Sequence, residues 1–99
     1  MRMIQKLVDD INEELEGAQH YAECYVEKKA AGKTMWANKF HTMAEDELKH
    51  ASNLHELAVE EIEHIRTVFK PTGDMQDKWD EAHKCYVSKA SWIKQMLEM

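Results

Sequence analysis

The sequence contains little that would interrupt a helix: of its 99 residues, three are glycine and one is proline. These two residues cost the most free energy inside a helix. Long uninterrupted helices are therefore expected. A chain of this length forms one small domain, so residues 1–99 are predicted to be a single domain.

Cysteines and long apolar runs are also scarce. Cys24 and Cys85 are too few for a disulfide framework and lack the spacing of a metal site, so we expect reduced thiols, with a bridge between them as the alternative. No run approaches the roughly 18 apolar residues of a membrane span, and the N-terminal residues lack the apolar core of a signal peptide. We therefore expect a cytoplasmic protein with no membrane partner.

Basic residues are outnumbered: 13 Lys and Arg stand against 19 Asp and Glu, for a formal net charge of −6. Nucleic-acid binding requires a basic patch that neutralises phosphates. The charge balance argues against a nucleic-acid partner and suits a protein that attracts cations.

The apolar residues recur at helical spacing and predict an all-α fold with helices over about 3–31, 35–69 and 74–98. Gly32 is expected to end the first helix, with Thr34 as the N-cap of the second. The short connection makes these two helices an antiparallel hairpin. Pro71 and Gly73 are expected to end the second helix, and Asp74 is a candidate cap for the third.

Each helix has one predicted buried stripe. The stripe of the first helix is Ile4, Leu7, Val8, Ile11, Leu15, Ala18, Ala22, Tyr25 and Val26, with Glu14 at its edge. The stripe of the second is Trp36, Phe40, Met43, Glu47, His50, Leu54, Leu57 or Ala58, Glu61 and Ile65. The stripe of the third is Trp79, Ala82, Tyr86, Ala90, Ile93 and Leu97.

The second helix carries an Asp46-Glu47-x-x-His50 motif in its middle. Residues three apart on a helix are neighbours, so one metal ion can touch both Glu47 and His50. Both lie on the predicted apolar stripe, where charged side chains are rare unless paired or metal-bound. This placement favours a metal site over an interhelical polar network without metal.

The hairpin brings Glu14 to the same level. Glu14 lies 18 residues before Gly32 and Glu47 lies 15 after it, or roughly 27 and 22 Å from the turn at about 1.5 Å per residue. The difference is about one helical turn, so Glu14, Glu47 and His50 can converge. Oxygen-rich sites with some imidazole suit iron or manganese; zinc is a further alternative.

Three candidate ligands from one hairpin are half of the number that a di-metal site in a four-helix bundle uses. The long stripes need more cover than a shorter third helix supplies, so we expect a homodimer or higher homo-oligomer. A two-fold axis would give four glutamates and two histidines, the inventory of carboxylate-bridged di-iron bundles.

On these residues the chain resembles the ferritin-like superfamily, particularly rubrerythrins and short encapsulated ferritins. The resemblance covers about residues 10–58 and is carried by Glu14-x6-Tyr21, Gly32 and Asp46-Glu47-x-x-His50. It implies a dimeric four-helix bundle in which Glu14, Glu47 and His50 bind iron, with Glu47 bridging two metals. It also implies a second-shell Tyr21, a histidine-orienting Asp46 and, for the encapsulated type, a shell protein as partner.

The expected function is therefore Fe(II) oxidation by O₂ or peroxide at a di-iron site shared between two subunits, with Glu14, Glu47, His50 and Tyr21 as its residues. A helical interaction module without catalysis and a metal carrier or sensor are the alternatives. Tyr21 could equally be an ordinary core aromatic.

Other polar residues have simpler interpretations. Glu61 and His64 repeat the Glu-x-x-His spacing, but Glu61 is expected to pair with Arg2 or Lys6. His83 is expected to be a packed or surface histidine, with an extra metal ligand as the alternative. A solvated face of the first helix is expected to hold Glu16, His20, Cys24 and Glu27, and the remaining histidines, His41 and His55, carry no signal.

Overall fold

The computed structural model describes residues 2–68, 70 and 72–99, and these form three α-helices and no strand. The helices are α1 (Arg2–Ala30), α2 (Thr34–Val68) and α3 (Gly73–Leu97). The predicted all-α class is confirmed, and each described helix end lies within one residue of its prediction. Phe69 and Pro71, which bear on the predicted end of the second helix, lie outside the described residues.

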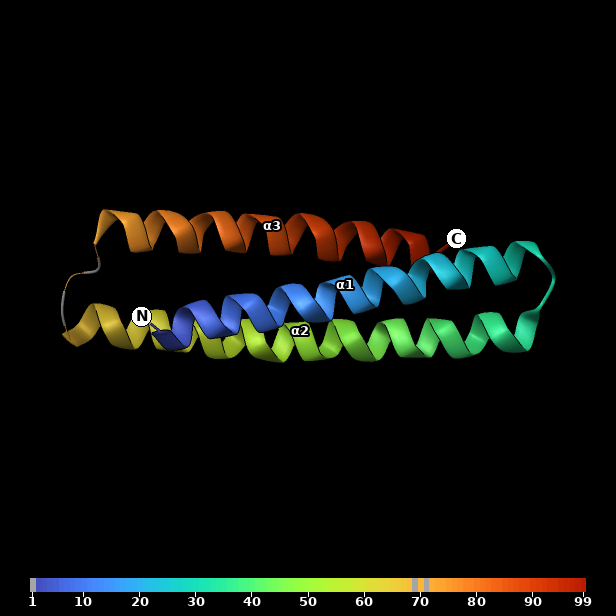
Figure 1. Cartoon of the computed structure of the whole chain (residues 1–99), viewed down its shortest axis with the longest axis horizontal. Coiled ribbons are helices and arrows are strands. Elements are labelled where there is room, and N and C mark those ends of the chain that lie inside the picture. The colour runs from blue at the N-terminus through green and yellow to red at the C-terminus, as the bar shows by residue number, and fades with distance from the viewer. Residues whose placement is uncertain (1, 69, 71) are drawn as a thin grey trace.

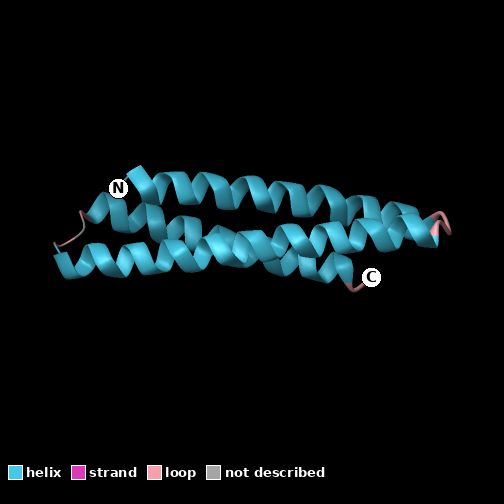
Figure 2. Cartoon of the chain, turned by 90° about the horizontal axis from the view of Figure 1, so that it is seen from below, coloured by secondary structure: helices cyan, strands magenta, loops and turns pink. Residues whose placement is uncertain are grey.

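The helices lie side by side along one axis and make a rod of 55 × 17 × 17 Å (Figure 1). α1 and α2 form the antiparallel hairpin that the short connection predicted, and α3 runs back along it, parallel to α1. The view in Figure 2 shows the same extended arrangement from a second side. None of the helices in the described part of the chain is long and apolar enough to cross a membrane.

The hairpin turn is built on Gly32, as predicted. Gly32 has φ +73°, in the left-handed region where a residue with a Cβ is disfavoured. The Lys33 N–H donates to the carbonyl of Lys28 at 2.9 Å, and the Gly32 N–H donates to Lys29 at 3.1 Å. This pair of bonds is a Schellman motif, which satisfies the last carbonyls of α1.

The two predicted N-caps are wrong. Thr34 is the first residue of α2 itself, and the carbonyl of the preceding Lys33 accepts from the Ala37 N–H at 2.9 Å. The cap of α3 is Thr72, whose hydroxyl accepts from the Met75 N–H at 3.2 Å. Asp74 instead lies in the first turn of α3, where a negative charge favours the helix dipole.

The core of the hairpin lies between α1 and a seam of alanines on α2. The α1 stripe is confirmed: its buried residues are Ile4, Leu7, Ile11, Leu15, Ala18, Ala22 and Tyr25, with Val8 and Val26 packed beside them. They face Ala37, Ala44, Ala51 and Ala58, which recur every seven residues and are at most 2% exposed.

The predicted α2 stripe is confirmed only toward the end of the helix, where Ala58 and Ile65 are buried. Its earlier part is wrong as the buried face of a single chain. Trp36 is 50% exposed, Met43 39% and Leu57 54%, while Phe40 and Leu54 are half-buried. Alanine lets the α1 backbone approach closely, so the small residues occupy the line of contact and the large ones lie along its edge. We call this edge, with Glu47 and His50 in its middle, the open face.

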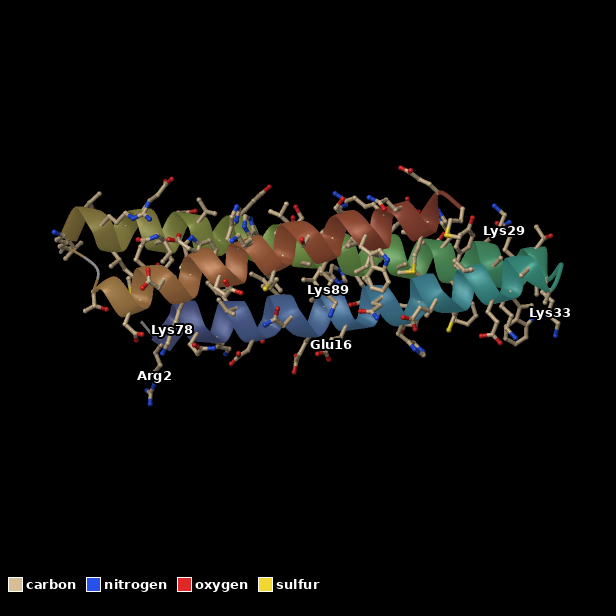
Figure 3. The ribbon with its side chains drawn as sticks, turned by 90° about the horizontal axis from the view of Figure 1, so that it is seen from above. Arg2, Glu16, Lys29, Lys33, Lys78 and Lys89 are labelled. Atoms are coloured by element: carbon tan, nitrogen blue, oxygen red, sulfur yellow. The ribbon has the colours of Figure 1, made fainter. Side chains whose placement is uncertain are left out.

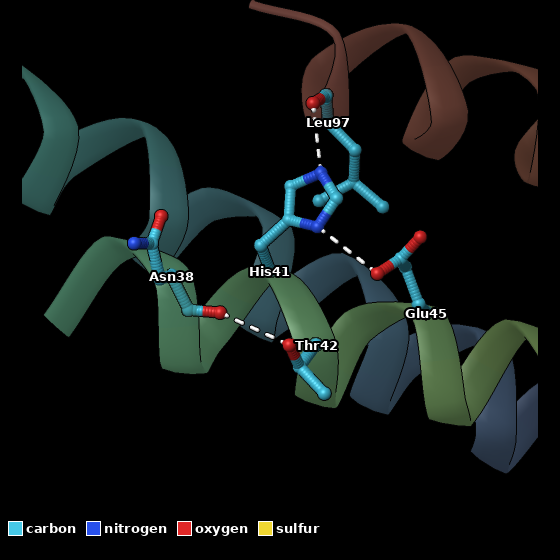
Figure 4. Close-up of polar contacts among 5 residues, drawn as sticks. All are labelled: Asn38, His41, Thr42, Glu45 and Leu97. Atoms are coloured by element: carbon cyan, nitrogen blue, oxygen red, sulfur yellow. Dashed lines mark hydrogen bonds and ion pairs between the residues drawn. The ribbon is translucent and has the colours of Figure 1, made fainter. Parts of the chain in front are cut away.

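α3 covers the other flank of the hairpin. Its buried residues are Met75, Trp79, Ala90, Ile93 and Leu97, while Ala82 and Tyr86 are half-buried. At its end, Nε2 of His41 lies 3.1 Å from the carbonyl oxygen of Leu97, and Nδ1 of the same ring lies 3.1 Å from a carboxylate oxygen of Glu45 (Figure 4). The Lys29 ammonium donates to the Met99 carbonyl at 2.6 Å. These contacts hold the end of α3 to both helices of the hairpin.

Charged side chains lie on the outside of the rod. Figure 3 shows Arg2, Glu16 and Lys33 pointing away from the ribbons. Of the predicted solvated face of α1, Glu16, His20 and Glu27 are exposed and Cys24 is half-buried. Both cysteines are free, as expected for reduced thiols.

Candidate metal centre

Glu14 of α1 and Glu47 and His50 of α2 converge on the open face. Each residue offers one ligand atom, and the three atoms lie within 4.8 Å of one another. The positions along the hairpin predicted this meeting, since Glu14 and Glu47 lie at similar distances from the Gly32 turn. Across the described residues this is the one cluster of three metal-ligating side chains.

His50 directs its ring toward α1. Its Nδ1 lies 3.4 Å from Oε2 of Glu14, with side-chain exposures of 56% for His50 and 29% for Glu14. Glu47 is half-buried. The expectation that Glu47 and His50 are both withdrawn from water is met only in part by Glu47 and is wrong for His50 in a single chain. The reason is that the alanine seam, and not their stripe, forms the line of contact with α1.

The side chain of Glu47 extends from α2 to the backbone of α1 at Gly17. A Cβ placed on Gly17 would come within 3.1 Å of Oε2 of Glu47 and 3.4 Å of its carboxyl carbon. Contacts near 3.1 Å are tighter than ordinary van der Waals contact. A glycine inside a helix costs about 1 kcal/mol relative to alanine, and here its missing side chain leaves room for a carboxylate.

The two carboxyl groups influence each other's charge. A side-chain hydrogen bond with Glu14, then burial, and then the negative charge of Glu14 raise the pKa of Glu47 above its usual 4.5, while His50 acts in the opposite direction. A carboxyl pair of this kind binds a proton more tightly than an isolated carboxylate does. A cation placed among these oxygens would compete with that proton.

The donor set fits a hard or borderline divalent ion. Two carboxylates and one imidazole match the ligands that iron and manganese take, and zinc accepts the same types. Three protein ligands leave coordination positions free for water, a second carboxylate or a reactant. The chemistry of these donors therefore fits the iron that the ferritin-like resemblance implies.

Neither Tyr21, two turns after Glu14 on α1, nor Asp46, next to Glu47 in the sequence, bonds to this cluster among the described residues. Tyr21 is half-buried and stacks on Phe40, with ring centroids 6.3 Å apart. Within the described chain its hydroxyl makes no hydrogen bond to Glu14 or Glu47, so its second-shell role stays a prediction. Asp46 is exposed and makes no ion pair with His50 among the described side chains.

Glu61 and His64 lie further along the open face. They line a shallow hollow with Met3, Leu7 and Leu57. The residues that the structure describes include no ion pair from Glu61 to Arg2 or Lys6, so the predicted salt bridge finds no support there.

Two histidines that contact α3, His41 and His55, gave no signal in the sequence. His55 lies against His83 of α3, with 2.7 Å between Nε2 and Nδ1, and His41 contacts the end of α3. Both meetings depend on how α3 packs, which helical spacing within α2 cannot reveal. Gly17 did have a signal, because a glycine inside a helix costs about 1 kcal/mol and can mark the close approach of a neighbouring helix. The group that approaches it is the Glu47 side chain of α2.

No protein-family model matches the chain, no curated protein matches it, and no solved structure matches it.

Proposed function

We propose that this chain binds Fe(II) through Glu14, Glu47 and His50, at a di-iron site shared between two copies, and promotes its oxidation by O₂ or peroxide. The observation that carries the proposal is the convergence of two carboxylates and an imidazole from two helices within 4.8 Å. The ferritin-like pattern of the same residues supports the choice of iron.

The second copy is inferred from the open face. Large apolar side chains remain exposed on both sides of the cluster, with Trp36 and Met43 before it and Leu57 after it. Several large apolar side chains exposed along one face are a common mark of an interaction site. A second copy is the occupant that also completes the centre, because it adds two carboxylates and an imidazole to three existing ligands.

In the metal-free chain the Glu14 carboxyl and burial raise the pKa of Glu47, so Glu47 holds a proton to a higher pH than an isolated carboxyl group does. Fe(II) and protons compete for this group, because only the carboxylate is a good ligand. Of the two residues from α2, Glu47 is the one that reaches the backbone of α1 at Gly17, and by the ferritin-like pattern it would bridge the two ions. Glu14 of α1 and His50 of α2 would complete the set of ligands from one chain.

The bound Fe(II) supplies the electrons: two ferrous ions give one electron each, and O₂ with two protons becomes hydrogen peroxide. The carboxylates suit this change because anionic oxygen stabilises the ferric product. The half-buried position of Glu47 between the helices keeps part of the centre away from bulk water.

The test is anaerobic titration with Fe(II) followed by exposure to air. We expect saturable binding near one iron per chain, and oxidation that falls to the buffer rate in Glu47→Ala. Glu61→Ala is the matched control, because Glu61 lies fourteen residues later on the same face of α2 and should leave both results unchanged. Equal oxidation rates in wild type and Glu47→Ala would refute the proposal.

A helical interaction module is the second candidate, favoured by the same exposed Trp36 and Leu57. It predicts that Glu47→Ala leaves the protein equally stable or more stable. If metal supports folding, EDTA lowers the melting temperature of wild type and has no effect on Glu47→Ala. A metal carrier or sensor would bind Fe(II) without turnover in the same titration.

A further inference from the structure

Two imidazole rings from different helices meet on the flank of the hairpin that α3 covers. Nε2 of His55 lies 2.7 Å from Nδ1 of His83, and the ring centroids are 4.9 Å apart. His55 follows His50 by five residues, which places it about 140° further around α2. It therefore faces α3, away from the candidate metal centre.

We propose that His55 and His83 form a second, bis-imidazole metal site that takes a borderline divalent ion such as Zn(II) or Cu(II) and links α2 to α3. At a metal–nitrogen distance of about 2.0–2.1 Å, two nitrogens lie roughly 2.9 Å apart when bound at right angles, as in tetragonal Cu(II), and roughly 3.3 Å apart at the tetrahedral angle of Zn(II). The observed 2.7 Å is shorter than both distances. With ring centroids 4.9 Å apart the two nitrogens point at each other, so metal binding requires the rings to turn, and His83 is the exposed ring of the two.

The surroundings of His55 position its ring. Tyr86 stacks on it with centroids 4.3 Å apart and 13° between the planes. The ring of Trp79, which is buried, lies 5.7 Å away on the same helix as Tyr86. A ring held between helices in this way loses little rotational freedom when it binds an ion.

Burial, followed by the charge of His83, lowers the pKa of His55, and Glu56 acts in the opposite direction.

The remaining coordination positions belong to water. Asp80 lies one turn before His83, but its Oδ1 accepts a hydrogen bond from Gln76 at 2.9 Å. Two imidazoles and water favour Cu(II) over Zn(II) in affinity. The ion would add a link between α2 and α3 at a level between two existing ones, the His41–Leu97 contact and the Arg66–Gln76 hydrogen bond of 2.8 Å.

This site is independent of the proposed iron chemistry, and the test is designed to keep the two apart. The full chain carrying Glu47→Ala and His50→Ala is titrated with Zn(II) by calorimetry, and Cu(II) is added for electron paramagnetic resonance. His55→Phe and His83→Ala are introduced into this background. Phenylalanine keeps the stacking on Tyr86 and removes only the ligand nitrogen, and far-ultraviolet circular dichroism verifies the fold.

We expect one Zn(II) to bind in the background protein, with at least a tenfold loss of affinity in His55→Phe and in His83→Ala. Zn(II) at 100 times its Kd should raise the melting temperature by at least about 5 °C. Cu(II) should show coupling to two imidazole nitrogens, and removal of the exposed His20 should change nothing. Unchanged affinity in both variants, or no binding in the background protein, would reduce the pair to a hydrogen bond and overturn the proposal.

Discussion

The carboxylate of Glu47 lies directly over Gly17, so closely that a Cβ on residue 17 would come within 3.1 Å of Oε2. This relationship joins the two halves of the hairpin at the centre of the candidate site. Glycine at this position has two opposite effects. It lowers the helix stability of α1, and it leaves the space that the Glu47 carboxylate occupies.

Gly17→Ala should therefore affect stability and metal binding in opposite directions. Alanine adds up to about 1 kcal/mol of helix stability, whereas its Cβ displaces the Glu47 carboxylate by a few tenths of an ångström. We expect a melting temperature equal to or above that of metal-free wild type and Fe(II) affinity reduced several-fold. Gly73→Ala is the control, since nothing lies within 4 Å of a Cβ there. Unaltered affinity in Gly17→Ala would show that the carboxylate does not depend on this space.

Glu47→Gln should alter how the stability of the metal-free protein depends on pH. The folded pKa of Glu47 is raised above 4.5, so the folded state binds more protons than the unfolded state between these two values. The free energy of unfolding should then fall as pH rises from about 4.5 through the folded pKa. Chemical denaturation at several pH values, with a chelator present, should give a flatter profile for Glu47→Gln. Identical slopes in the two proteins would contradict the raised pKa.

His55 should make the free energy of unfolding depend on pH in the opposite direction to Glu47. Its folded pKa lies below the usual 6.5, so the unfolded state binds more protons between the two values. The contribution of His55 to the free energy of unfolding is fully present above pH 6.5 and is lost as the pH falls through the folded pKa. The metal-free His55→Phe variant should lose less stability over this range than wild type. A loss as large as that of wild type would assign the effect to other groups.

Leu57→Glu should separate the proposed dimer. Leu57 is 54% exposed on the open face, and burying an unpaired carboxylate in an interface costs several kcal/mol. We expect a dimer dissociation constant raised by about 100-fold or more, which corresponds to about 2.7 kcal/mol, as measured by sedimentation velocity. Val87→Glu is the matched control, because Val87 of α3 is 52% exposed and lies off this face. A wild-type chain that sediments as a monomer at all concentrations would exclude the shared site.

Much of the candidate site could be predicted because it depends on distances along helices. The Glu47-x-x-His50 spacing puts two ligands on one face, and the count of residues on either side of Gly32 brings Glu14 to their level. Both arguments use only the rise and period of an α-helix. The same arguments failed for the burial of α2, where two neighbouring faces both carry apolar residues at helical spacing. The larger side chains made the wrong face look like the core.

The sequence by itself determined three long helices, the position of the hairpin turn and the register of Glu14, Glu47 and His50, since each follows from local backbone geometry. Only the tertiary structure decided that alanines form the line of contact, that Gly17 makes room for Glu47, and that His55 meets His83. The reason is physical: how closely two helices approach depends on the smallest side chains on both, and which rings meet across them depends on where a third helix packs.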